Sequence, residues 1–125
     1  MIVEHPKVAF QDERGAITDL LQDVEIESVT LITSRAGAVR GNHYHKETIQ
    51  YTYVLKGKVC AYTQDGEDAE IQSRMLVPGD LLTSPANERH ALKAIEDSTL
   101  LILTRGPRSG TSYEDDTFRI PSIVK

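Results

Sequence analysis

The sequence is poor in the residues that hold small secreted proteins together. Among its 125 residues there is one cysteine and no tryptophan, and aromatic residues make up only 6%. The single Cys60 cannot form an internal disulfide, so we expect a reducing, cytoplasmic environment and an inert, buried thiol. No apolar run is long enough for a membrane span, and the charged N-terminus, interrupted by Pro6, is unlike a signal peptide.

An excess of positive charge is also absent. The formal net charge is −5, which argues against a nucleic-acid partner because such binding needs a basic surface. The chain is 39% hydrophobic and 26% charged, as in water-soluble globular proteins. Its length suits one domain, so we expect a single domain over residues 1–125. We also expect the partner of this domain to be a small molecule.

Short strand-like segments dominate what is present. Residues 27–34 are rich in β-branched side chains, and the segments 50–57 and 58–66 meet at Gly57, which predicts a hairpin. The continuous apolar run over residues 98–104 is typical of a strand covered on both faces. Turns at intervals of about eight to twelve residues indicate an all-β sandwich or barrel.

Two of the four histidines lie in "GNHYHKETIQ", residues 41–50. Residues two apart in a strand point to the same face, so His43 and His45 project together, about 6.5 to 7 Å apart along the backbone, and Tyr44 projects to the other face. Imidazoles at this spacing can converge on one ion. Two histidines exposed on an edge strand would explain the same pattern without any function.

The wider spacing resembles the first motif of the cupin superfamily, G-x5-H-x-H-x3-4-E-x6-G. Gly37, the two histidines and Gly57 occupy the motif positions, and Gln50 replaces the usual glutamate. A second cupin motif, a P-G-D turn followed by P-x-G-x2-H, is matched more loosely by residues 78–90. His90 takes the histidine position of that motif, and Asn87 takes the glycine position.

The resemblance covers about residues 28–105 and implies a single cupin β-barrel, or jelly roll, with the histidines lining its interior. The N-terminal strands and the C-terminal extension are expected to pack on this barrel. Small cupins often pair through an N-terminal strand, and the segment "IVEHPKVAF" could serve, so we expect a homodimer.

In cupins that bind metal, three histidines and a glutamate hold one divalent ion, which implies a site made of His43, His45, Gln50 and His90. Neutral imidazoles suit Zn, Fe, Mn, Ni or Cu. Gln50 could bind only through its amide oxygen, so the ion would be held less tightly and would be a stronger Lewis acid. Glu47 could supply the missing carboxylate if the strand stays regular, although a solvated strand end is the simpler interpretation.

The string "RGNHYHKETIQ" is similar to R-G-x-H-A-H-K-x-x-x-Q of the nucleotide-sugar 3,4-ketoisomerases, which are also small cupins. In that group the glutamine is normal and no metal is needed. His43 and His45 would then act as general acid and base on a 4-keto sugar. Tyr44 in place of alanine and the presence of His90 depart from that pattern.

The same resemblance implies that Arg40 binds the sugar or the phosphates of the substrate, and we assign Tyr53 to substrate binding as well. Regular strand alternation directs Arg40 away from the histidines unless Gly41 lies in a bulge. A surface charge is the alternative interpretation of Arg40. Arg105 and Arg108, in a C-terminal segment that resembles the Tyr- and Asp-rich tails of sugar-modifying cupins, could bind a phosphate.

Three hypotheses remain from the sequence. We favour a metal-dependent enzyme of the isomerase, epimerase or dioxygenase type, with a sugar-related substrate that could be a sugar nucleotide. The alternatives are a metal-free nucleotide-sugar ketoisomerase and a non-catalytic cupin that binds a small ligand. His90 favours the first hypothesis over the second, because metal-binding cupins keep this histidine.

Overall fold

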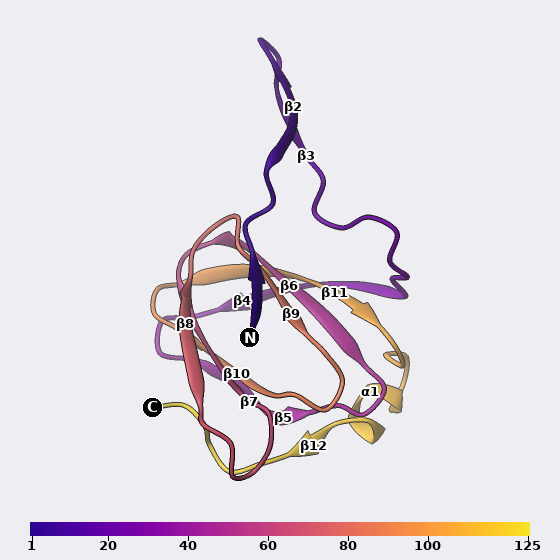
Figure 1. Ribbon diagram of the computed structural model, residues 1–125, viewed down its shortest axis with the longest axis vertical. Coiled ribbons are helices and arrows are strands. Elements are labelled where there is room, and N and C mark those ends of the chain that lie inside the picture. Colours follow the sequence, from indigo (N-terminus) through magenta and orange to yellow (C-terminus); the bar gives the residue numbers. More distant parts are fainter.

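Two antiparallel sheets of five strands each face one another across the interior of the molecule (Figure 1). The computed structural model describes all of residues 1–125. The first sheet contains, in spatial order, β1 (Ile2–Glu4), β9 (Leu81–Ser84), β6 (Ile49–Lys56), β11 (Ser98–Arg105) and β4 (Ser28–Ser34). The second contains β12 (Phe118–Arg119), β5 (Val39–Tyr44), β10 (Arg89–Ala94), β7 (Val59–Gln64) and β8 (Gln72–Leu76). The all-β barrel predicted from the sequence is confirmed.

Apolar side chains fill part of the space between the sheets. Strand alternation produces this core. Leu100 and Ile102 on β11 point inward and are buried, whereas the alternating residues Leu101 and Leu103 are partly exposed. The apolar cluster comprises Val54, Val59, Ala61, Leu76, Leu82, Ala94, Leu100 and Ile102. The rest of the interior carries polar side chains and is open enough to hold a ligand, as described below.

The predicted hairpin across Gly57 is wrong, because β6 and β7 belong to different sheets. The chain crosses from one sheet to the other at this point. Gly57 has φ +90°, and a Cβ added there would lie 2.5 Å from the carbonyl oxygen of Asp97 and 2.7 Å from Cα of Ser98. Two strand-like segments joined by a short turn predict a hairpin when only the local sequence is considered. That the chain instead passes from one sheet to the other depends on packing across the barrel.

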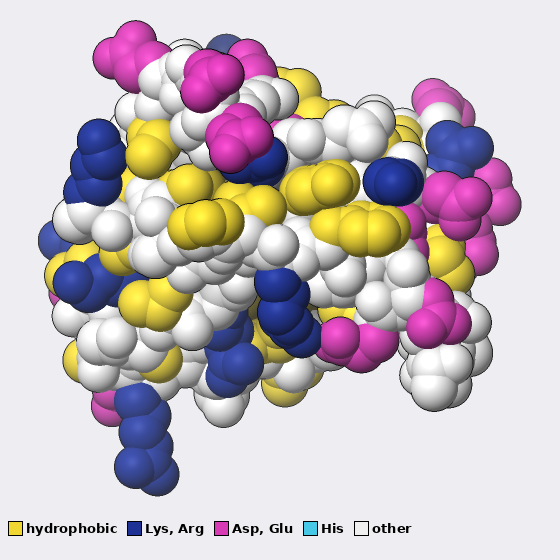
Figure 2. Space-filling model, turned by 90° about the horizontal axis from the view of Figure 1, so that it is seen from below, with side chains coloured by type: hydrophobic (Ala, Val, Ile, Leu, Met, Phe, Trp, Pro, Cys, Tyr) yellow, Lys and Arg dark blue, Asp and Glu magenta, His cyan; other side chains and the backbone are white.

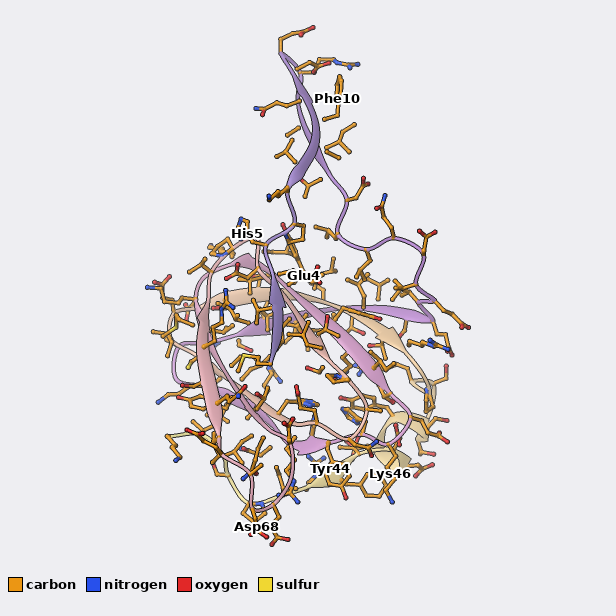
Figure 3. The ribbon with its side chains drawn as sticks, viewed as in Figure 1. Glu4, His5, Phe10, Tyr44, Lys46 and Asp68 are labelled. Atoms are coloured by element: carbon orange, nitrogen blue, oxygen red, sulfur yellow. The ribbon has the colours of Figure 1, made fainter.

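The N-terminal region divides into two parts. β1 pairs with β9 on the barrel, whereas β2 (Val8–Asp12) and β3 (Gly15–Thr18) pair only with each other and extend away from it (Figure 1). Phe10 lies on this projecting hairpin, and His5 lies at its base (Figure 3). We expected the N-terminal strands on the barrel. The hairpin stands away because its sheet ladder joins no barrel strand.

The C-terminal extension runs across one end of the barrel and then along the second sheet. It contains the short helix α1 (Ser112–Asp115) and β12, which pairs with β5. Phe118 on β12 stacks on Tyr44 with 5.3 Å between ring centroids, so Tyr44 faces outward as predicted. No helix in the structure has the length and apolar character needed to cross a membrane. Basic, acidic and apolar side chains all occur on the face shown in Figure 2.

Replacing Gly57 with alanine should lower the free energy of unfolding by about 3 kcal/mol, because the new methyl group would meet backbone atoms at a positive φ. The matched control is Gly66→Ala, since a Cβ at Gly66 meets nothing within 4 Å. Chemical denaturation of both variants tests the expectation. Equal stability of the two variants would contradict the packed crossing.

Candidate functional site

Three histidines meet inside the barrel. His43 on β5 lies directly opposite His90 on β10, and His45 follows the end of β5. The ring centroids are 4.7 Å apart for His43 with His45, 4.7 Å for His43 with His90, and 5.3 Å for His45 with His90. One nitrogen from each ring can be chosen so that all three lie within 4.8 Å of one another. The predicted convergence of these side chains is therefore observed.

Backbone carbonyls fix two of the three rings. Nδ1 of His45 lies 2.9 Å from the carbonyl oxygen of Asp116, and Nδ1 of His90 lies 3.2 Å from that of Glu88. A carbonyl only accepts hydrogen bonds, so Nδ1 carries the proton in both rings and Nε2 keeps its lone pair. Nδ1 of His43 is buried and has no partner.

A carboxylate outside the cavity holds the turn that follows His45. Asp116 accepts hydrogen bonds from the backbone N–H groups of Lys46, Glu47 and Thr48 at 2.9 to 3.2 Å, and from the Thr48 hydroxyl at 2.7 Å. Burial alone would raise the pKa of Asp116, but these hydrogen bonds outweigh it and the pKa is lowered. The ionised carboxylate thus ties α1 and β12 to the turn between β5 and β6.

The histidine rings are held in their neutral form. Burial lowers the pKa of His43 to about 3, with further lowering by the charges of His90, His45 and Arg119. Burial, followed by the charge of His45, lowers the pKa of His90 to about 4. Burial also lowers the pKa of His45, although the Asp116 carbonyl opposes the shift. At neutral pH each ring therefore offers a lone pair and no positive charge.

The histidines lie beside a cavity of about 390 Å³. Its polar lining includes His43, His90, Gln50, Ser84, Tyr113 and the arginines Arg40, Arg108 and Arg119. None of the residues lining it is an aspartate or glutamate. The cavity thus combines neutral nitrogen donors with positive charge, which suits an anionic ligand.

Gln50 completes the polar cluster. It is buried, and its amide nitrogen donates to the Tyr113 hydroxyl at 3.3 Å. The same hydroxyl lies 3.4 Å from Nε2 of His45. Donation through the nitrogen leaves the amide oxygen of Gln50 as the atom that could bind a cation.

Arg40 reaches the cavity through a bulge. Gly41 and Asn42 both have positive φ, +93° and +57°, and this irregularity lets Arg40 and His43 line the same space. The Arg40 guanidinium donates from Nε to the Ser34 hydroxyl at 2.8 Å and from Nη2 to the Thr33 carbonyl at 2.9 Å.

Two other candidates lie elsewhere. Gln50 and Thr52 on β6 face the cavity, so strand alternation turns Tyr53 to the outer side of the sheet, away from the cavity. Glu47 is exposed and lines a separate surface hollow with Asp115 and Asp116. It is therefore not the missing carboxylate beside the histidines.

The sequence analysis missed two of the residues that line the cavity and undervalued a third. Tyr113 comes from α1 and Arg119 from β12, in a segment without apolar periodicity. The Arg108 guanidinium, noted for phosphate binding, lies 4.2 Å from the centroid of the Tyr113 ring. The resemblance of this segment to the Tyr- and Asp-rich tails of sugar-modifying cupins was the one available signal.

The donor set fits a divalent metal ion. Nitrogens bound to one tetrahedral zinc lie roughly 3.4 Å apart, so the separations here would close by small rotations of the rings. Two rings already donate their other nitrogen to a carbonyl, as metal-bound histidines usually do. The buried Nδ1 of His43, which has no hydrogen-bond partner, is a further atom that an ion would satisfy.

Comparison with known proteins gave a family match and several similar structures. The profile of the family described as the polysaccharide biosynthesis C-terminal domain matches residues 10–118. A search of curated protein sequences returned no match.

The similar structures include a dTDP-4-dehydrorhamnose 3,5-epimerase from Sulfolobus tokodaii, with 21% identity and a TM-score of 0.77 over 98% of this chain and 81% of that one. The sugar 3,4-ketoisomerase QdtA from Thermoanaerobacterium thermosaccharolyticum, in complex with TDP, has 22% identity and a TM-score of 0.76 over 94% of this chain and 86% of that one. The capsular polysaccharide assembling protein CapF from Staphylococcus aureus has 19% identity and a TM-score of 0.70, and the match covers 89% of this chain but 31% of CapF. These structures confirm the small cupin fold and the predicted likeness to 3,4-ketoisomerases.

The metal-free protein should lose stability as the pH falls from about 6.5 towards 4. The folded-state pKa values of His43 and His90 lie below the value of about 6.5 in an unfolded chain, so the unfolded chain binds more protons in this range. The stabilisation is complete above pH 6.5, and we expect a loss of roughly 3 kcal/mol by pH 4, allowing for some solvent access to the rings.

Urea denaturation at several pH values, with a chelator present, measures this loss. His90→Gln should show a shallower decrease, because one of the two titrating rings is gone. If the free energy of unfolding falls equally with pH in the variant and in the unchanged protein, the fold does not hold the histidines neutral.

Proposed function

Because the chain belongs to the family of the polysaccharide biosynthesis C-terminal domain, we propose that it is an isomerase or epimerase acting on the sugar of a sugar nucleotide. We further propose that His43, His45 and His90, with Gln50, hold a divalent ion at the reacting sugar. The convergence of three buried, neutral imidazoles, two of which line an arginine-rich cavity, carries this proposal.

The pKa values of the rings support a metal-binding role over acid–base work. A histidine whose pKa is about 3, as at His43, gains no second ring proton at neutral pH, so it is a weak base and offers no imidazolium as a general acid. It remains an effective ligand, because a metal ion binds the unprotonated nitrogen. A bound ion would supply a Lewis acid for the carbonyl oxygen of a keto sugar.

The reaction needs a proton removed from the carbon next to the keto group. The electron pair of that C–H bond forms an enolate, and a proton returned to the same carbon completes epimerisation. For isomerisation the hydroxyl proton of that carbon moves to the former keto oxygen, and the returned proton goes to the neighbouring carbon. The Tyr113 hydroxyl, 3.4 Å from Nε2 of His45, is placed to exchange such a proton. Arg108 and Arg119 supply positive charge for a diphosphate, and the similar ketoisomerase QdtA was solved with TDP bound.

A metal-free ketoisomerase is the second candidate, and the environment of His45 favours it. The Asp116 carbonyl fixes the tautomer of His45 and opposes the lowering of its pKa, so this ring is the better base of the three. His45 and Tyr113 would then pass the proton between them. The metal content of the protein decides between the two candidates.

His43→Ala and His90→Ala should each weaken metal binding by at least about 100-fold, since each removes one of three nitrogen ligands. Elemental analysis of untagged protein, purified without chelator, should give about one equivalent of metal before substitution and almost none after it.

His5→Ala is the matched control, because His5 is the fourth histidine and lies at the base of the hairpin, away from the cavity. It should keep its full metal content. Full metal content in His90→Ala, or none in the unchanged protein even after soaking, would rule out the three-histidine site.

The unchanged protein should exchange a carbon-bound hydrogen of TDP-4-keto-6-deoxyglucose with solvent deuterium, detected by NMR or mass spectrometry. Tyr113→Phe should slow the exchange by at least roughly 100-fold if the hydroxyl moves the proton. Tyr51→Phe, the same substitution on β6 at a residue that does not line the cavity, should not. Absence of exchange with this and other 4-keto sugar nucleotides would leave a non-catalytic binding role.

We also propose that the protein is a homodimer. The projecting hairpin exposes Val8, Phe10 and Ile17 by 51 to 59%, and an isolated two-stranded hairpin is marginally stable in water. At the edge of the first sheet, Val29 and Leu31 on β4 are 62 and 63% exposed. A second copy whose hairpin packs on this apolar strand would cover both surfaces.

Phe10→Glu should convert the dimer to a monomer, because it puts a charge in the centre of the apolar hairpin surface. Light scattering coupled to size-exclusion chromatography measures the mass. Met75→Glu, an exposed apolar position on β8, should leave the dimer intact. A monomeric unchanged protein would contradict the proposal.

A further inference from the structure

The bulge in β5 brings two side chains into one cavity that a regular strand would separate. Residues three apart in a strand face opposite sides, yet Arg40 and His43 both line the cavity. In the pairing with β10, Gly41 lies opposite Ala91 and His43 lies opposite His90, so Asn42 is the extra residue.

The residues of the bulge suit its backbone conformation. Gly41 has φ +93°, and a Cβ there would lie 2.8 Å from the carbonyl oxygen of His90. Asn42 has φ +57°, a left-handed conformation that asparagine tolerates better than most residues with a Cβ.

The C-terminal segment holds the bulge in place. The N–H of Ile120 donates to the backbone carbonyl of Asn42 at 2.9 Å, and the N–H of Ile123 donates to the side-chain Oδ1 of Asn42 at 3.0 Å. Ile123 is 4% exposed and packs in a cluster with Ala91, the residue paired with Gly41. Backbone, side chain and apolar packing thus anchor the bulge from the side away from the cavity.

We propose that Asn42 is a positioning residue that keeps Arg40 and His43 directed into the same cavity. It is not among the residues that line the cavity, so it acts through its neighbours. Binding of a ligand in that cavity rests on the proposed function, whereas the positioning of Arg40 and His43 by Asn42 does not. Ile120 and Ile123, whose backbone N–H groups bind Asn42, therefore also help to shape the site.

The Arg40 side chain gives a test that needs no ligand. Its Nε–H donates to the Ser34 hydroxyl, so its ¹⁵N–¹H signal should exchange slowly with water and should be assignable by its loss in Arg40→Lys. Asn42→Ala removes the Oδ1 acceptor and disfavours the left-handed backbone, so this signal should shift or vanish. Asn42→Asp keeps an acceptor and should retain it.

Gly79→Ala provides a variant strained on the connection between β8 and β9, because Gly79 has φ +95° and a Cβ there would meet the His5 ring, and it should retain the Arg40 signal. An unchanged signal in Asn42→Ala would overturn the proposal. Loss of the signal in both variants would overturn it too, because general loosening would then explain the effect.

Titration with Co²⁺ alone, followed by its visible absorption, tests the consequence at His43. Asn42→Ala should bind Co²⁺ at least about 10-fold more weakly, and Asn42→Asp and Gly79→Ala within about 3-fold of the unchanged protein. No Co²⁺ binding by the unchanged protein would reject the metal site, and the Arg40 signal would still decide the role of Asn42. If Asn42→Ala binds Co²⁺ as tightly as the unchanged protein does, the metal site stands and the proposed positioning of His43 by Asn42 is overturned.

Discussion

The bonds of Asp116 to the turn after His45 are the interaction on which the arrangement of the site depends. The carboxylate satisfies three consecutive backbone N–H groups and the hydroxyl of Thr48, while the carbonyl of the same residue orients His45. This one residue therefore fixes the His45 ring, closes the turn between β5 and β6, and holds the C-terminal segment over the end of the barrel. Tyr113 and Arg108 reach the cavity because that segment is held there.

Neutrality is the second physical constraint on the site. Three imidazoles this close cannot all take up a second ring proton and become positively charged without strong mutual repulsion, and burial penalises the charged form of each. The positive charge of the cavity comes instead from its arginines, and no carboxylate lines it to cancel that charge. The result is a polar interior that favours anionic ligands and that also offers the neutral imidazole nitrogens of the histidines as donors.

The sequence predicted the convergence of His43, His45, His90 and Gln50 because strand alternation and the cupin spacing agree at those positions. It could not place Arg40, since one extra residue reverses the alternation and only φ values and strand pairing show the bulge. Tyr53 lies on the outer side of β6, because that strand alternates regularly and Gln50 and Thr52 take the positions that face the cavity. Tyr113 and Arg119 lie in a segment without periodic pattern, so their position depends on contacts with residues far away in the sequence.

Strand order in the first sheet has a consequence for how the chain folds. β4 lies at the sheet edge and pairs only with β11, so that Ser28 is joined to Thr104 across most of the sequence. During synthesis the apolar residues of β4 leave the ribosome long before their partner strand exists. The histidine cluster likewise waits for His90 to pair with His43. Folding is therefore dominated by late, non-local contacts, and the nascent chain carries an unpaired, aggregation-prone strand until residue 105 has emerged.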